Sequence, residues 1–195
     1  AGCAIAILGQ FMGVNAVLYY GPKIFSEAGF DNPMFSTVLV GLVNFATTIL
    51  AVFIIDRVGR KQLIYWGVSG MIICLIAIGT YFATGGALGN GFMLAFFLAY
   101  VFCCAISISA IVFVLLSEMY PNSIRGRAMS LAGFMLWVGT YLVGQLTPVL
   151  LEWSQAGTFF IFAVMCVPYM LIMWKVIPET TGKTLEEIEE YWKKR

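Results

Sequence analysis

The sequence predicts an all-α membrane protein with six transmembrane helices, because of its composition and the length of its apolar runs. Hydrophobic residues make up 61% of the chain, charged residues only 11%, and the mean hydropathy is +0.93. A soluble domain carries about twice that charged fraction. Short polar links separate apolar stretches of roughly 20 residues, which is the length that a helix needs to cross a bilayer.

The predicted spans form one domain, residues 1–177, and a polar tail covers residues 178–195. The spans cover residues 1–25, 35–55, 62–83, 92–116, 128–153 and 158–177. In the tail, Thr184 and Glu187 can form a capping box, and Leu185, Ile188 and Trp192 recur at helical spacing. We therefore expect a short cytoplasmic amphipathic helix. Its acidic face favours packing against the basic loops over recruitment of a partner.

Basic residues fall almost entirely on one side of the predicted bundle. Of eleven Lys and Arg residues, only Lys23 falls on the opposite side. By the positive-inside rule, the basic loops and the C-terminus are cytoplasmic, in a multi-pass protein of the plasma (inner) membrane. The chain begins inside an apolar segment without the basic flank of a signal peptide, so we expect it to be part of a longer protein.

The first span carries polar side chains where a bilayer-spanning helix is expected to be apolar. Gln10, Asn15, Tyr19 and Tyr20 are costly in hydrocarbon unless they are paired, which indicates a functional role. On an unbroken helix, Gln10 and Asn15 lie about 140° apart. They can face one cavity only if the helix breaks near Gly13. We therefore predict a broken, solute-binding helix.

The sequence offers few groups for catalysis or metal binding. It contains no His, and no Asp or Glu falls in the middle of a predicted span, so we expect no enzyme activity. The five cysteines lie within apolar runs without a CxxC pair, which is typical of packing residues. No metal, cofactor or nucleic-acid partner is expected.

The cytoplasmic links carry carboxylates and guanidinium groups that can pair. Glu118 ends one span and Arg125 begins the next, so the turn between them can bring them together. Arg60 can join them, because guanidinium groups bind carboxylates bidentately. The cluster is either a latch that breaks in another conformation or a static network. The predicted latch residues are Asp56, Arg57, Arg60, Glu118, Arg125 and Glu179.

Four motifs in this order, GQFMGVNAVLYYGP, DRVGRK, SEMYPNSIRGR and PETTGKTLEEIEEYW, resemble the C-terminal half of a sugar porter of the major facilitator superfamily. They are closest to those of bacterial xylose/hexose–proton symporters, and the resemblance covers essentially the whole chain. It implies six helices of a twelve-helix transporter that moves a sugar or polyol by alternating access. The implied partners are the substrate, protons in the case of symport, membrane lipid, and the missing N-terminal half or a second copy of the chain.

The resemblance also implies a substrate site. Its residues are Gln10, Asn15, Tyr19, Tyr20, Asn44, Phe113, Trp137 and Thr140. As an alternative, Asn44 bonds across a helix interface. Three positions depart from the family pattern, because Gly9, Phe113 and Leu136 stand where members carry Gln, Trp and often Gln or Asn. Each lost hydrogen bond is expected to weaken sugar binding by about 0.5–1.5 kcal/mol.

Two further expectations follow from these departures. The fourth span contains neither Gly nor Pro between residues 92 and 120, so it is expected to bend less easily at its centre than in family members. A less polar solute or a smaller polyol also fits the altered site. The alternative function is a non-transporting membrane receptor or a structural half-domain with a weakened sugar site.

Overall fold

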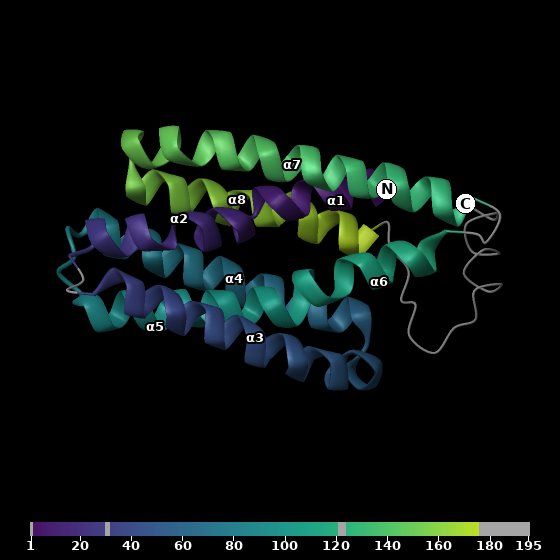
Figure 1. Cartoon of the computed structure of the whole chain (residues 1–195), viewed down its shortest axis with the longest axis horizontal. Coiled ribbons are helices and arrows are strands. Elements are labelled where there is room, and N and C mark those ends of the chain that lie inside the picture. Colours follow the sequence, from purple (N-terminus) through teal and green to yellow (C-terminus); the bar gives the residue numbers. More distant parts are fainter. Residues whose placement is uncertain (1, 30–31, 121–123, 176–195) are drawn as a thin grey trace.

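The computed structural model describes residues 2–29, 32–120 and 124–175, without the side chains of Pro33 and Asp56. The described residues fold into helices that run along one common direction (Figure 1). The predicted tail helix lies outside them. The elements are α1 (Gly2–Phe11), α2 (Val14–Glu27), α3 (Pro33–Val58), α4 (Arg60–Ala83), α5 (Asn90–Cys104), the π-helix η1 (Ala105–Ser109), α6 (Ala110–Met119), α7 (Arg125–Trp153) and α8 (Gln155–Lys175).

Taken across their breaks, these elements make six segments that are long and apolar enough to cross a membrane. The segments are Gly2–Glu27, Met34–Ile55, Arg60–Ala83, Asn90–Met119, Arg125–Trp153 and Gln155–Lys175. The predicted boundaries differ from these by three residues or fewer. The predicted fold class, an all-α membrane protein with six transmembrane helices, is confirmed.

The first span consists of two helices, α1 and α2, that are separated by a break at Gly13. Gly13 has φ 89° and ψ 8°, the left-handed region that L side chains rarely adopt. A Cβ atom at this position would also collide with the ring of Phe162 from α8. The expected break near Gly13 is confirmed, and both its backbone angles and its surroundings require glycine.

The backbone groups that the break frees are paired inside the protein. The N–H of Gly13 donates to the carbonyl of Gln10 at 3.2 Å. The buried hydroxyl of Tyr100, on α5, donates to the carbonyl of Met12 at 2.9 Å. Irregular backbone at membrane depth is tolerated when other protein groups satisfy it in this way.

The fourth span is also irregular, although it lacks glycine and proline. The π-helix η1 separates α5 from α6 at the centre of the span. The sequence predicted a helix that bends less easily and did not predict this irregularity. Gly67 of α4 lies directly against this segment, because a Cβ there would collide with Ser107 and with the carbonyl oxygen of Cys103. Short π-helical segments occur frequently at functional sites.

We expect Tyr100→Phe to lower thermal stability, whereas Tyr169→Phe is expected to leave it unchanged or raise it. Both side chains are fully buried. Removing the Tyr100 hydroxyl leaves the carbonyl of Met12 unpaired, at a cost of about 1–3 kcal/mol. The Tyr169 hydroxyl has no hydrogen-bond partner among the described residues. Thermal unfolding of the two variants in detergent micelles measures the difference, and equal losses would contradict this account.

Candidate solute-binding site

The break in the first span brings its two carboxamides together. The Nδ2 of Asn15 donates to the Oε1 of Gln10 at 2.6 Å, across the break between α1 and α2. The hydroxyl of Thr140, on α7, lies 3.1 Å from the same oxygen and can donate to it. Gln10 and Thr140 are buried. The three side chains therefore form a polar cluster within an otherwise apolar bundle, which we call the carboxamide cluster.

The carboxamide cluster has hydrogen-bonding capacity left for a ligand. Each carboxamide offers two N–H donors and one oxygen acceptor. Within the described part of the chain, the Nε2 of Gln10 and the Oδ1 of Asn15 have no hydrogen-bond partner. A donor and an acceptor on adjacent groups match a solute hydroxyl, which can both give and receive a hydrogen bond.

Close approach of α7 supplies one wall of the cluster. A Cβ at Gly139 would lie 3.3 Å from the side chain of Gln10 and from the carbonyl oxygen of Ile7, so the small residue lets α7 pack against α1. The hydroxyl of Tyr20 donates to the carbonyl of Gly144 at 2.8 Å. This bond connects α2 to α7. Tyr20, which was predicted to bind substrate, therefore makes a structural contact.

Asn44 lies on α3. It is distant from the carboxamide cluster in the sequence, but in the structure it lies beside α2 of the broken first span. It lines a narrow recess with Val14, Leu18, Tyr100, Val101, Cys104 and Ser109. Its carboxamide makes no hydrogen bond to another side chain in the described part of the protein, and its backbone carbonyl accepts from Thr48 at 2.8 Å. The predicted site residues did not include Tyr100 or Ser109, although both are polar residues within an apolar run.

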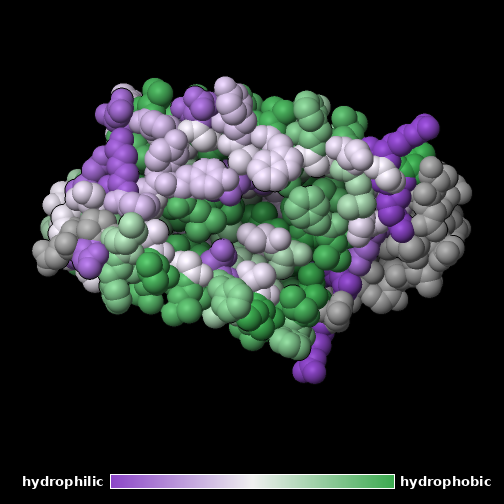
Figure 2. All heavy atoms as spheres, in the orientation of Figure 1, coloured by the Kyte–Doolittle hydropathy of each residue, from purple (hydrophilic) through white to green (hydrophobic). Residues whose placement is uncertain are grey.

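Three of the four predicted aromatic site residues lie at the surface of the described structure. Trp137 is 66% exposed, Tyr19 58% and Phe113 51%. Such exposure leaves their rings free to contact a solute or another part of a transporter. Figure 2 shows a face that is hollowed along its middle, between α7 above and α3 below, with hydrophobic atoms in the hollow and a few hydrophilic residues among them.

Two of the three departures from the family pattern are buried. Gly9 faces the bundle, where a Cβ would lie 3.6 Å from the ring of Tyr169 and 3.7 Å from Ile108. Leu136 is buried, and its carbonyl lies 3.0 Å from the hydroxyl of Thr140. Neither position offers a polar side-chain group for hydrogen bonding.

The predicted latch residues are only partly brought together. Arg60, at the start of α4, pairs with Glu118 of α6 at 3.1 Å, and both are largely buried. The Nε of Arg125 instead donates to the carbonyl of Tyr120 at 3.3 Å. Arg57 is exposed and forms no ion pair with another described residue. The side chain of Asp56 and the whole of Glu179 lie outside the described residues.

Comparison with known proteins identifies the family. A family model described as "Sugar (and other) transporter" matches residues 1–192, and the chain belongs to this family. It is 39% identical over 197 residues to an arabinose-proton symporter of Bacillus subtilis, covering 98% of this chain and 42% of the symporter. It is 38% identical over 200 residues to the D-xylose-proton symporter of Escherichia coli, covering 98% of this chain and 40% of that protein.

The structure resembles one half of a solved transporter. A proton:xylose symporter of the major facilitator superfamily, bound to 6-bromo-6-deoxy-D-glucose, matches with a TM-score of 0.88 and 38% identity. The match covers 98% of this chain and 42% of the symporter. The protein is therefore an integral membrane protein with one half of the major facilitator fold, and it spans about 40% of the length of the curated relatives it matches. These relatives are transporters by name and not enzymes.

We expect Gly13→Ala to destabilise the protein and to uncouple Gln10 from Asn15. Alanine at φ 89° costs about 1–2 kcal/mol, and its Cβ collides with Phe162. Gly41→Ala is the control, because a Cβ there meets only open space on α3 and improves helix propensity. Thermal unfolding of both variants tests the expectation, and equal stability of the two would contradict it.

We expect the ion pair between Arg60 and Glu118 to stabilise the fold. Arg60→Gln and Glu118→Gln are each expected to destabilise the protein, because either change removes an ion pair between two largely buried side chains. The double variant is expected to lose less stability than the two single losses added together, with a coupling energy of about 0.5–3 kcal/mol. A double-mutant cycle on unfolding free energies measures it, and additive losses would show that the contact contributes nothing.

Proposed function

We propose that the chain is the C-terminal half of a transporter that moves a sugar or polyol across a membrane by alternating access. The observation that carries this proposal is the break at Gly13, which joins Gln10 and Asn15 in a buried cluster with Thr140. A transmembrane helix that breaks around paired carboxamides is typical of a substrate site at the bilayer midplane. The names of the relatives, which transport pentoses with protons, support the same substrate class.

The proposed substrate contacts divide by chemistry. Gln10, Asn15, Asn44 and Thr140 supply hydrogen bonds, because their free donors and acceptors match those of sugar hydroxyls. Trp137, Tyr19 and Phe113 supply exposed rings against which the apolar face of a sugar packs. Tyr20 acts mainly through its bond to Gly144, which positions α2 against α7.

The other half of the proposed transporter covers the exposed faces of α3 and α7. In the most apolar window of α3 only 17% of the residues are buried, compared with 50% for α4. An N-terminal half or a second copy of the chain would shield this face, and lipid would cover the remaining apolar surface. For proton symport, we propose that the other half supplies the coupling carboxylate.

The charged end of the bundle is the proposed cytoplasmic side. Arg57, Arg60, Lys61, Arg125 and Arg127 all lie in or beside the same two links, as the positive-inside rule requires of cytoplasmic loops in a plasma (inner) membrane. There the pair of Arg60 and Glu118 acts as a latch that holds one conformation. Its proposed further members, Arg57, Arg125, Asp56 and Glu179, would exchange partners when the two halves rock.

The second candidate function is a receptor or structural module of the same fold that does not transport. The observation that favours it is the loss of polar groups at Gly9 and Leu136, both of which face buried, apolar surroundings. A transporter requires a sugar to bind at the carboxamide cluster, whereas a purely structural module does not, and this difference can be measured.

We expect xylose or glucose to quench the fluorescence of Trp137 saturably, and Gln10→Ala to weaken binding about tenfold. The substitution removes the oxygen shared by Asn15 and Thr140, together with a free donor, at about 0.5–1.5 kcal/mol for each bond. A background with only Trp137 isolates its signal from that of the other tryptophans, and Gln155→Ala serves as a control away from the cluster. Quenching that survives in Gln10→Ala, or no quenching in either protein, would favour the second candidate.

A further inference from the structure

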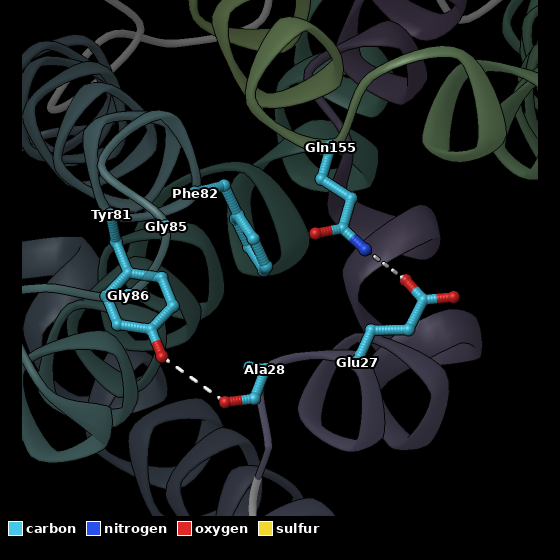
Figure 3. Close-up of a pocket in the computed structure, with 7 residues that line it drawn as sticks. All are labelled: Glu27, Ala28, Tyr81, Phe82, Gly85, Gly86 and Gln155. Atoms are coloured by element: carbon cyan, nitrogen blue, oxygen red, sulfur yellow. Dashed lines mark hydrogen bonds between the residues drawn. The ribbon is translucent and has the colours of Figure 1, made fainter.

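A polar cavity of about 200 Å³ lies at the end of the bundle opposite the Arg60–Glu118 pair. Its wall is formed where α2 ends, where α4 ends and where α8 begins (Figure 3). The lining residues are Glu27, Ala28, Tyr81, Phe82, Gly85, Gly86 and Gln155. None of them is among the residues of the proposed sugar site.

The groups that this cavity presents are mainly acceptors. Glu27 contributes a carboxylate, and its Oε2 accepts a hydrogen bond from the Nε2 of Gln155 at 2.6 Å. That bond engages the donor side of the Gln155 amide, and Figure 3 shows the amide oxygen turned toward the space beside Phe82. The carbonyl of Ala28 completes the set at the end of α2.

Most donors on the described lining are already engaged. The hydroxyl of Tyr81 lies 2.9 Å from the Oδ1 of Asn90 and 3.3 Å from the carbonyl of Ala28. The N–H groups of Gly85 and Gly86 donate to the carbonyls of Phe82 and Tyr81. The Gln155 amide keeps one N–H besides the one that it gives to Glu27. Acceptors and a carboxylate therefore predominate on this wall, which suits a ligand that donates hydrogen bonds or is positively charged.

Two helix ends contribute negative potential to the cavity, while the start of α8 at Gln155 contributes positive potential. α2 ends at Glu27 and α4 ends at Ala83, and neither has a basic residue in its last turn. The C-terminal end of a helix carries a partial negative charge, which favours a nearby cation. The ring of Phe82 offers a π face or edge at the same place, and its stack on Phe159, with centroids 5.6 Å apart and planes at 4°, fixes its orientation.

The one basic side chain near the carboxylate in the described structure is Lys23. Its Nζ lies 3.8 Å from the Oε1 of Glu27, one helical turn along α2, and both side chains are partly exposed. Exposed pairs of this kind contribute little stability. A bound cation therefore competes with Lys23 for the carboxylate and is not excluded by it.

We propose that this cavity binds a small organic cation of the ammonium class, held by the carboxylate of Glu27, the amide oxygen of Gln155 and the ring of Phe82. The site goes beyond the proposed transport function and does not depend on it. It places a cation-binding position on the rim of the bundle, at the opposite end of α4 from the Arg60–Glu118 pair.

The experiment compares choline with 3,3-dimethylbutan-1-ol, its uncharged isostere, as ligands of the protein reconstituted in lipid nanodiscs. Binding is measured by saturation-transfer nuclear magnetic resonance and by isothermal titration. We expect choline to bind and the isostere to bind at least tenfold more weakly, because the two molecules have the same shape and differ in charge. Equal binding of both would overturn the proposal, as would the failure of choline to bind.

Two substitutions with opposite expected signs separate a binding role from a structural one. Glu27→Gln is expected to weaken choline binding about tenfold, since it removes the charge and keeps the size of the side chain. Lys23→Met is expected to strengthen binding roughly threefold, because it removes the competing cation and keeps an apolar stem. A general loss of folding would weaken binding in both variants and would not produce this reversal.

Further variants localise the site. Phe82→Leu is expected to weaken choline binding roughly two- to fivefold through the loss of the aromatic ring. Glu152→Gln, at an exposed carboxylate near the end of α7 and outside the cavity lining, is the control and is expected to leave binding unchanged. Loss of choline binding in Glu152→Gln equal to that in Glu27→Gln would show a nonspecific surface effect and would refute the site. Sugar binding at Trp137 is measured in the same samples, so failure of one proposal does not imply failure of the other.

Discussion

The constraint on which the rest of the structure depends is that a helix broken inside a membrane must find partners for the backbone groups it frees. Gly13 makes the break possible, because it adopts a positive φ in a space that the ring of Phe162 closes to any side chain. Tyr100 then reaches across from α5 to the carbonyl of Met12. An unpaired carbonyl at this depth costs several kcal/mol, so the broken first span is stable only when α5 and α8 pack against it.

The same break determines where polar side chains can be placed. An unbroken helix would hold Gln10 and Asn15 on different faces, whereas the break lets their carboxamides meet at 2.6 Å. The close approach of α7 at Gly139 then brings Thr140 to the shared oxygen. Paired carboxamides are inexpensive in an apolar bundle, and their unused donor and acceptor remain available to a solute. The structural requirement and the proposed chemical function are therefore met by one arrangement.

The sequence predicts those features that depend on composition and on the chain alone. The apolar runs predict the six spans, and the angular separation of Gln10 and Asn15 predicts the break at Gly13. Features that depend on contacts between distant segments were not predictable. The π-helix at 105–109 contains no glycine or proline, and it lies against Gly67 of another helix. The sequence predicts that Glu118 pairs with Arg125 and that Arg60 can join them, whereas in the structure Glu118 pairs with Arg60 and Arg125 donates to the carbonyl of Tyr120.

The two ends of α4 differ in electrostatic potential, and the side chains around them follow that difference. The N-terminal end of a helix carries partial positive charge and the C-terminal end partial negative charge. At the N-terminal end, the carboxylate of Glu118 lies beside Arg60, where the helix end and the guanidinium group both favour an anion. At the C-terminal end, Glu27 and the amide oxygen of Gln155 surround a cavity without a basic residue on its described lining. The C-terminal ends of α2 and α4 disfavour a carboxylate at this second end, and a bound cation would offset that repulsion. Glu118 is paired with a largely buried arginine, whereas Glu27 has the amide of Gln155 and the partly exposed Lys23.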